Sequence, residues 1–368
     1  MSAAPSWEAS GLAALTGAPG QPAHPVRDHV RALERLLREV EAAARGLGGD
    51  LALDLGLFTE RAAELGLQGQ GRTSCNGSAR MLRTADGWAA VNLARPDDAD
   101  LIPAWIGRMG AAGPWDDLAD HARTSKAEDF VARGRLLGVP VAVVRRPGEI
   151  RGRAVPSRAS PGRRRPDRPL RVVDLSALWA GPLCGRLLAD LGAEVIKVES
   201  PRRPDAARQG TPRLFERLHR GQTFRALDFT APDGRADLLA LIEDADVVIE
   251  ASRPRALAQI GVYAAEILAR RPGLTWISLT AYGRAGDQGQ WIGFGDDVAA
   301  AAGLVAFDAA DAPVFLGDAI ADPIAGLTMA RDGLRAILAG GGMVEVSMQA
   351  AAAAIADTDP LPSAEAAA

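Results

Sequence analysis

Residues 171–201 read RVVDLSALWAGPLCGRLLADLGAEVIKVESP, and this stretch decides the fold. Arg171–Leu175 is a short apolar run rich in β-branched residues, which is typical of a buried strand. Pro182 suits the first turn of a helix, because a backbone N–H has no partner there. Leucines at helical spacing continue the helix until a glycine ends it, and Ala193–Val198 forms a second strand. The stretch predicts a βαβ unit of a parallel sheet, with a ligand near Ser176–Pro182 at the carboxyl end of the first strand.

The rest of the C-terminal half continues the alternation of strands and helices. This pattern predicts an α/β domain with a Rossmann-like, doubly wound sheet over residues 170–358, followed by an Ala- and Pro-rich tail at 359–368. The other candidate strands are Phe224–Asp228, Asp246–Ile249 and Thr275–Thr280, and the candidate helices are Leu183–Leu191, Gly234–Glu243, Ala256–Ile260, Ala264–Arg270 and Asp322–Leu338.

The first 70 residues predict a helical segment. Val26, Val30, Leu33, Leu37 and Val40 recur at three and four residues, which indicates an amphipathic helix with its charged side chains on the opposite face. A second helix is expected over Ala52–Leu65.

Residues 71–144 predict a smaller α+β domain. Asp86-Gly87 is a strong turn signal between two alternating runs, so Met81–Ala94 is expected to form a hairpin. Short helices are expected at Leu101–Ile106, Trp115–His121 and Lys126–Leu137, with a final strand at Val139–Val143. Residues 145–169 combine Pro, Gly, Ser and many Arg with almost no apolar side chains, which is the composition of a linker.

Composition limits the classes of function. The net charge of −4 gives no reason to expect nucleic-acid binding, and no apolar run reaches the ~18 residues of a membrane span. The first ten residues lack the basic and apolar regions of a signal peptide, so we expect a cytoplasmic protein. Cys75 and Cys184 are too few for a disulfide scaffold or a four-ligand metal site, and we expect no metal.

The stretch 171–201 also resembles a sequence signature of a known family. LSALWAGPLCGRLLADLGAEVIKVE, at 175–199, resembles the opening signature of the class III CoA-transferases, a family that includes formyl-CoA transferase and the α-methylacyl-CoA racemases. The similarity continues in order through Glu250–Pro254, Ile277–Gly283, Gly317–Gly326 and Met343–Ser347. It covers the second half of the chain. Residues 71–144 resemble the small domain of the same family, which usually follows the catalytic half, so this chain resembles a rearranged member.

The resemblance implies that Asp322 is the catalytic residue. Asp322 stands in GDAIADPIAGL, and Pro323 at the first helical position would make it the N-cap of its helix. In the family, such a carboxylate attacks an acyl-CoA thioester, and the reaction passes through aspartyl anhydride and aspartyl–CoA thioester intermediates. Asp318 is a weaker second candidate, while Asp296 and Asp297 are interpreted as helix caps.

The resemblance further implies CoA as substrate, with an acyl-CoA donor, a carboxylic acid acceptor and a homodimer. Two arginines of formyl-CoA transferase are replaced here by Ser200 and Gln259. We expect Arg202, Arg203 or Arg255 to meet the phosphates instead, since Arg gives bidentate phosphate contacts. The residues that match the family's CoA contacts are Trp179, Ala180, Leu227, Asp228, Arg253, Tyr282 and Gly283.

Two rival functions stay open. A racemase shares the fold but pairs its aspartate with a histidine, and the matching segment here reads Gly295-Asp296-Asp297. A non-catalytic CoA-binding module is favoured by the missing arginines and the rearranged order. An NAD dehydrogenase is disfavoured, because no GxGxxG follows the first strand.

Overall fold

The central sheet of the computed structural model has seven strands in the order β6-β14-β11-β10-β7-β8-β9. The structure describes residues 7–150, 158–159 and 168–358. Six strands are parallel, and β6 at the edge runs antiparallel to β14. The strands are β6 (Arg158–Ala159), β7 (Arg171–Asp174), β8 (Glu194–Glu199), β9 (Thr223–Ala226), β10 (Val247–Glu250), β11 (Thr275–Thr280) and β14 (Gly342–Ser347). The parallel strands follow the Rossmann order, which confirms the doubly wound sheet.

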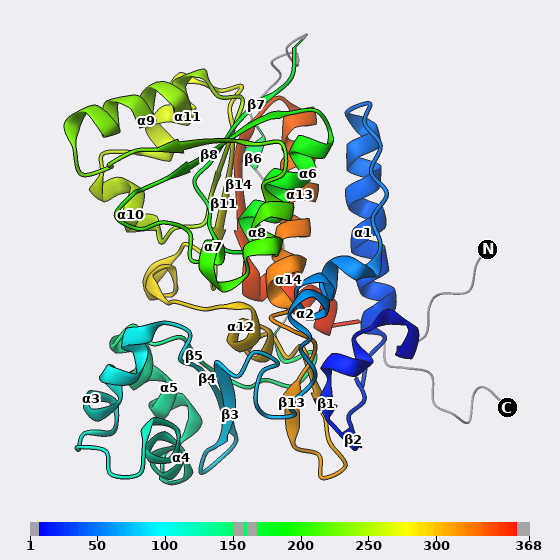
Figure 1. Cartoon of the computed structure of the whole chain (residues 1–368), viewed down its shortest axis with the longest axis vertical. Helices are drawn as coiled ribbons and strands as arrows, with labels where there is room; N and C mark the ends of the chain where they lie inside the picture. Colours follow the sequence, from blue (N-terminus) through cyan, green and yellow to red (C-terminus); the bar gives the residue numbers. More distant parts are fainter. Residues whose placement is uncertain (1–6, 151–157, 160–167, 359–368) are drawn as a thin grey trace, which may run out of the picture.

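Alternate side chains of the strands enter two different cores. Val172 of β7 packs toward one face of the sheet and Val173 toward the other, as the period of two requires. Figure 1 shows α6, α13 and α1 on one face and α9 and α11 on the other. The helices of this lobe are α6 (Ala180–Asp190), α7 (Ala207–Gly210), α8 (Pro212–Leu218), α9 (Pro232–Asp244), α10 (Pro254–Gln259), α11 (Ala264–Arg270), α12 (Gly295–Ala301), α13 (Ala321–Ala339) and α14 (Met348–Ala356), with the 3-10 turn η5 (Gly286–Gln290).

The winding of the sheet reverses beside β7. From β7 the chain proceeds through β8 and β9 in one direction, and through β10, β11 and β14 in the other. Ligands of such sheets bind at the carboxyl ends of the strands next to this switch point. In Figure 1 the carboxyl ends point toward the smaller lobe. The start of α13 lies at this edge too, because its other end leads directly into the amino end of β14, which pairs with the amino end of β11.

The smaller lobe confirms the predicted α+β domain. Its three antiparallel strands follow the order β3-β4-β5, and the Asp86-Gly87 turn joins the first two as expected. Trp105, Leu118 and Phe130 are buried against this sheet. The elements are β3 (Ala79–Arg83), β4 (Trp88–Asn92), β5 (Val141–Val143), η4 (Pro96–Leu101), α3 (Ile102–Ile106), α4 (Pro114–Thr124) and α5 (Ala127–Leu136). The β3–β4 hairpin packs on α12 and on the hairpin of β12 (Val305–Phe307) and β13 (Pro313–Phe315).

The N-terminal segment shares its core with the α/β lobe. Leu33, Leu37 and Val40 of α1 (His29–Gly46) belong to the same buried cluster as Leu187 of α6 and Leu334 of α13. The shorter elements of this segment are η1 (Glu8–Ser10), η2 (Ala13–Leu15), β1 (Gly17–Ala18), β2 (Gln21–Pro22), η3 (Leu55–Phe58) and α2 (Glu60–Leu65).

The helix expected over Ala52–Leu65 is divided into η3 and α2. Asp54 is extended and its Oδ1 accepts the N–H of Gly56 at 2.7 Å, so a new element begins only there. Thr59, at φ −125°, then separates the two pieces. The side chain of Asp54 therefore competes with a continuous helix for the backbone.

Part of the predicted linker has a defined place. Arg145 N–H donates to the carbonyl of Ala300 at 3.0 Å, and residues 158–159 pair with β14 at the sheet edge. Linker residues 151–157 and 160–167 and the predicted tail, 359–368, lie outside the described residues. No helix in the described part of the chain has the length and apolar character needed to cross a membrane.

Candidate active site

Asp322 lies inside the first turn of α13. The helix begins at Ala321, and Ile320 occupies the cap position without a side-chain bond. The expectation that Asp322 is the N-cap is therefore wrong. The turn before the helix explains the shift, because Ala319 adopts φ +44° and its carbonyl accepts the N–H of Asp322 at 2.9 Å. The carboxyl group of Asp322 is consequently free to face α12.

Gly295, the first residue of α12, lies directly against Asp322. A Cβ at Gly295 would stand 2.5 Å from Asp322 Oδ2 and 2.3 Å from the carbonyl oxygen of Ala319, so this approach needs glycine. The backbone N–H of Gly295 also acts to lower the pKa of Asp322. Asp296 was expected to be a cap, but its Oδ1 accepts the N–H of Ala319 at 2.9 Å instead. Both residues of α12 thus fix the loop that carries Asp322.

Arg61 of α2 is the cation of this site. Its Nε and Nη2 contact Asp318 Oδ2 and Oδ1 at 2.7 and 2.5 Å, and Asp318 is completely buried. The guanidinium carbon also lies 5.3 Å from the ring centroid of Trp179. Sequence reasoning missed Arg61, because it stands 257 residues from its partner and no local motif marks it.

The carboxyl groups at this site bind protons unusually tightly. Burial raises the pKa of Asp322 to about 7; Arg61 opposes this shift, and Asp296 and Asp318 add to it. Burial, assisted by the charge of Asp318, raises the pKa of Asp296 to about 6. At neutral pH a large share of Asp322 is therefore ionised, while its proton affinity lies far above that of an ordinary aspartate.

The prediction that Asp297 caps a helix is confirmed, at the start of α12. Its Oδ1 accepts the N–H of Phe294 at 3.0 Å and the side-chain amide of Asn92, on β4 of the smaller lobe, at 3.1 Å. Burial raises the pKa of Asp297 to about 7. Tyr282 packs nearby with its ring 5.5 Å from that of Trp291, in an edge-to-face contact. This region joins the two lobes beside the carboxyl edge of the sheet.

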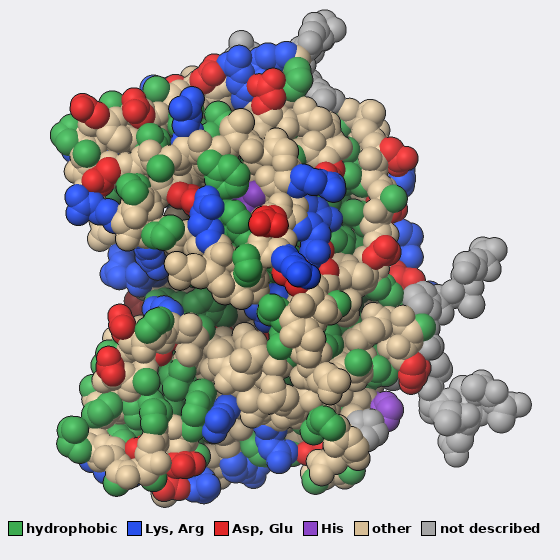
Figure 2. Space-filling view, in the orientation of Figure 1, with side chains coloured by type: hydrophobic (Ala, Val, Ile, Leu, Met, Phe, Trp, Pro, Cys, Tyr) green, Lys and Arg blue, Asp and Glu red, His purple; other side chains and the backbone are tan. Residues whose placement is uncertain are grey.

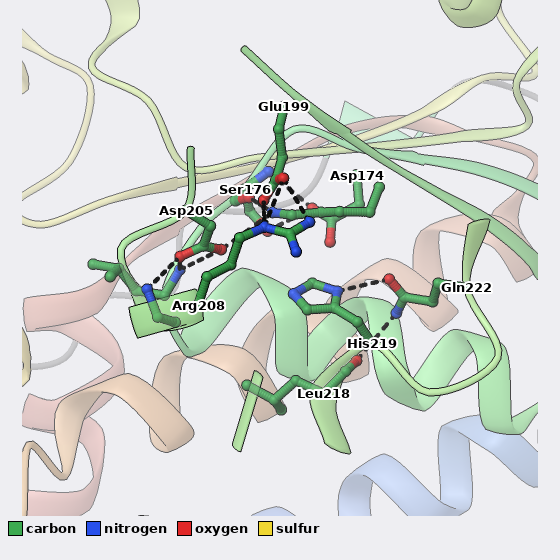
Figure 3. Close-up of polar contacts among 11 residues, drawn as sticks. Asp174, Ser176, Glu199, Asp205, Arg208, Leu218, His219 and Gln222 are labelled. Atoms are coloured by element: carbon green, nitrogen blue, oxygen red, sulfur yellow. Dashed lines mark hydrogen bonds and ion pairs between the residues drawn. The ribbon is translucent and has the colours of Figure 1, made fainter. Parts of the chain in front are cut away.

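A buried polar cluster surrounds the turn that follows β7 (Figure 3). Asp174 Oδ1 accepts the N–H and the hydroxyl of Ser176 at 2.8 and 2.5 Å. Lys197 of β8 is 1% exposed, and it contacts the carbonyl of Ser176 and the carboxylate of Asp205. His219 is buried below this turn, with its Nδ1 2.8 Å from Gln222 Oε1. Sequence reasoning did not single out Lys197 or Asp205.

Every residue predicted to contact CoA follows the carboxyl end of a parallel strand. Trp179 and Ala180 begin α6 after β7, and both residues are buried. Tyr282 and Gly283 follow β11, where Gly283 adopts φ +100° and donates its N–H to Thr280 Oγ1 at 3.1 Å.

Leu227 and Asp228 follow β9 at the far end of the sheet. Leu227 N–H donates to the carbonyl of Glu199 at 2.9 Å. Asp228 Oδ1 accepts from the hydroxyl and the N–H of Thr230 at 2.6 and 2.9 Å, and these bonds lower its pKa. Arg202 pairs with Asp228 at 3.1 Å. These contacts engage Arg202 within the protein.

Arg253 belongs to a group of arginines on the rim between the lobes. Its pKa is lowered by partial burial and by the neighbouring charges of Arg255, Arg203 and Arg95. Arg95 pairs with Asp98, whereas Arg203, Arg253 and Arg255 form no ion pair with the residues that the structure describes. Figure 2 shows Lys and Arg side chains gathered beside the furrow between the two lobes, below α10. Cations held together without ion-pair partners make the potential of this rim positive.

Sequence comparison places the second half of the chain with known enzymes. Residues 168–366 match the profile of CoA-transferase family III. The probable fatty acyl-CoA transferase Rv3272 of Mycobacterium tuberculosis is 41% identical over 151 residues, which are 38% of each chain. The succinyl-CoA–D-citramalate CoA-transferase of Chloroflexus aurantiacus is 36% identical over 179 residues, or 44% of each chain. The chain thus covers less than half the length of these curated relatives.

Two solved structures are similar to part of this chain. The crystal structure of Rv3272 in its orthorhombic form has 36% sequence identity and a TM-score of 0.47, covering 51% of this chain and 55% of that one. A CAIB/BAIF family protein of Brucella suis has 28% identity and a TM-score of 0.47, covering 50% and 54%.

Proposed function

We propose, since the chain belongs to CoA-transferase family III, that it moves CoA from an acyl-CoA thioester to a carboxylic acid by covalent catalysis on Asp322. The observation that carries the proposal is the position of this carboxyl group. It lies at the carboxyl edge of a doubly wound sheet, in the segment that matches the family, and Gly295 of α12 lies directly against it. A carboxylate is a competent nucleophile toward a thioester when it is ionised and held in place.

The reaction then proceeds in four balanced transfers. A carboxylate oxygen of Asp322 attacks the thioester carbonyl, the C–S bond breaks, and a mixed anhydride and CoA thiolate form. The thiolate attacks Cγ of Asp322, which releases the donor acid and leaves an aspartyl–CoA thioester. The acceptor carboxylate attacks this thioester and displaces the thiolate, forming a second anhydride. The thiolate finally attacks the acceptor acyl carbon, which frees Asp322 and the new acyl-CoA.

The surroundings of Asp322 support this role. Each attack places negative charge on a carbonyl oxygen, and the positive end of the helix dipole of α13, whose first turn carries Asp322, would stabilise that charge. Arg61 lowers the pKa of Asp322 against the effect of burial, and so favours the ionised form that attacks.

The arginine group on the rim supports binding of CoA. Its nucleotide end is polyanionic, and Arg203, Arg253 and Arg255 lie after the carboxyl ends of β8 and β10 without ion-pair partners among the described residues. Ser200 and Gln259 offer no charge, so these arginines would replace the two that the family uses. Arg202 is the weaker candidate, because Asp228 already engages it.

Two substitutions at Asp322 test the proposal. Asp322→Asn should abolish transfer between acyl-CoA and acid, because an amide forms no anhydride, while the affinity for CoA stays close to that of the wild type. Asp322→Ala should be equally inactive, and it should lose no cap energy, since the side chain makes no cap bond. Asp332→Asn, on an outer position of the same helix, is the matched control and should keep full turnover.

Trapping provides the second measurement. Hydroxylamine added during incubation with a panel of CoA thioesters should convert Asp322 to its hydroxamate, which mass spectrometry locates by peptide. Transfer activity in the Asn variant, or a label at another residue, would remove Asp322 from the mechanism.

The racemase alternative lacks its second group. Proton transfer on both faces of a carbon needs two positioned acids or bases. Asp296 occupies the position of the family's histidine, but it is 4% exposed and bound to the N–H of Ala319. Incubation of a 2-methylacyl-CoA in deuterated water distinguishes the two functions, because a racemase incorporates deuterium at the α carbon and a transferase does not.

We further propose that the chain works as a homodimer, as the family resemblance implies. Light scattering during gel filtration measures the mass in solution. A monomer that retains full transfer activity would contradict the dimer.

A further inference from the structure

Leu178, in the turn after β7, has an unfavourable backbone conformation. Its φ is +70°, in the left-handed region that side chains other than glycine rarely adopt. The leucine side chain is 38% exposed, so burial in the core does not hold the residue there. Some other interaction must therefore stabilise the turn.

Asp205 provides that interaction. Both of its carboxylate oxygens lie 3.1 Å from the N–H of Leu178, and Oδ1 also accepts the N–H of Ala207 at 3.0 Å (Figure 3). The carboxylate comes from the loop between β8 and α7, so a second segment of the chain fixes the conformation of the first turn.

Lys197 connects the two sides of the turn. Its ammonium group donates to the carbonyl of Ser176 and lies 3.4 Å from Asp205 Oδ2. Both charged side chains are 1% exposed. A buried ion pair is poor evidence for stability, because desolvation offsets the attraction, and its best-supported use is to specify one conformation. Here the conformation so specified is that of Ser176–Leu178.

We propose that Lys197 and Asp205 are positioning residues that hold Leu178 left-handed and so shape the turn that receives the nucleotide of CoA. The inference rests on the proposed function for the identity of the ligand. The ion pair acts by holding the backbone of Leu178 at positive φ, a conformation that glycine would adopt without the ion pair.

A rescue experiment with glycine at position 178 tests whether the ion pair acts through this backbone conformation. Asp205→Ala should weaken the affinity for CoA roughly tenfold, the factor that corresponds to the strain of one left-handed residue. Leu178→Gly alone should bind within about threefold of the wild type, because glycine populates positive φ readily. The double variant should regain most of the lost affinity. Isothermal titration with CoA measures all four proteins. If Asp205→Ala does not fold, the apolar pair Asp205→Leu/Lys197→Met replaces it, because it leaves neither an acceptor for the N–H of Leu178 nor an unpaired buried charge.

Asp117→Ala is the matched control. Asp117 is also a buried carboxylate that binds loop N–H groups, those of Ala111 and Gly113 at 3.1 and 3.2 Å, but it belongs to the smaller lobe. Its removal should lower the melting temperature without changing the affinity for CoA. A general loss of stability therefore cannot imitate the expected result.

Two outcomes overturn the inference. One is unchanged CoA binding by Asp205→Ala, and the other is a loss that Leu178→Gly does not restore. Hydrogen exchange of the Leu178 amide gives a readout that needs no ligand, since Asp205→Ala should expose it and leave the amide of Ala111 protected. If the wild type binds no CoA but this exchange result holds, the proposed function fails while the positioning of the turn stands.

Discussion

Three aspartates near α12 hold their protons to unusually high pH, and this affects stability. Burial raises the pKa of Asp296 to about 6 and those of Asp297 and Asp322 to about 7, against about 3.9 in an unfolded chain. The folded state therefore binds more protons than the unfolded state between about pH 4 and pH 7. The contribution of these groups to stability is complete below pH 4 and is lost as the pH rises through 7.

Asp297→Asn should flatten this dependence. The asparagine keeps an oxygen for the N–H of Phe294 and needs no proton to be neutral. The free energies of unfolding measured with denaturant at pH 5 and pH 8 should differ less for this variant than for the wild type. Asp308→Asn is the control. Backbone N–H groups lower the pKa of Asp308, so loss of this carboxylate should leave the pH dependence of the unfolding free energy above pH 5 unchanged. A wild-type stability that rises between pH 5 and pH 8, with no change in Asp297→Asn, would contradict the assignment.

Arg61→Gln should affect both stability and catalysis. It leaves Asp318 buried without its partner, which costs about 3–5 kcal/mol of unfolding free energy. It also removes the cation that lowers the pKa of Asp322, so the acidic limb of the pH–rate profile should move to higher pH.

The double variant Arg61→Gln/Asp318→Asn should recover much of the stability, because no charge then remains unpaired. Arg72→Gln, which breaks the exposed pair with Asp308, is the comparison and should cost no more than about 1 kcal/mol. Chemical denaturation and pH–rate profiles provide the two measurements. An unshifted acidic limb in active Arg61→Gln would show that Arg61 has no influence on the nucleophile.

At the scale of elements, the contact of α13 with α6 depends on Gly326. A Cβ there would lie 2.5 Å from the carbonyl oxygen of Ala180, a backbone atom that cannot move without its helix. Gly326→Ala should therefore cost about 1–3 kcal/mol and displace the start of α6. Gly333→Ala is matched on the same helix, but its Cβ would meet side-chain atoms, Cδ1 and Cγ1 of Ile277 at 2.4 and 3.3 Å, rather than backbone. Urea unfolding should rank Gly326→Ala as clearly the less stable variant.

The elements that sequence reasoning found are those whose signals are local. Arg171–Leu175 was expected as a strand and Arg171–Asp174 forms one, because a β-branched run between polar residues has few alternatives. The Asp86-Gly87 hairpin has its own turn chemistry. The short hairpin of β12 and β13 was missed, since three-residue strands have too few residues for a periodic pattern.

The sequence predicts those parts of the candidate site that lie within one continuous segment of the chain. The predicted contacts lie at the carboxyl edge because the order of strands and helices dictates that edge. Arg61, Gly295 and Asp205 were not predictable, because each acts on a residue brought near only by the fold. The cap role of Asp322 failed for the same reason, since the turn at Ala319 is fixed by Asp296 across space.

The whole molecule is held together by a core that both halves of the chain share. The Pro- and Arg-rich composition of 145–169 predicts that trypsin cuts there first. Because α1 and α13 belong to one buried cluster, the two fragments should stay associated in native buffer. A denaturing gel should show two bands while gel filtration shows one undivided species, and guanidinium should be needed to separate them. Separate elution in native buffer would show that the common core contributes little.

The packing of α1 against α13 also has a consequence during translation, because α1 is synthesised long before α13. Glu39 and Arg331, which pair at 2.9 Å, are 292 residues apart. At about 5–20 residues per second, a ribosome leaves the apolar side of α1 uncovered for roughly 15–60 s. Nascent chains of this protein should therefore engage general chaperones through α1 and release them only after α13 has emerged. Ribosome-bound chains stalled before and after residue 339 should differ in chaperone occupancy for this reason.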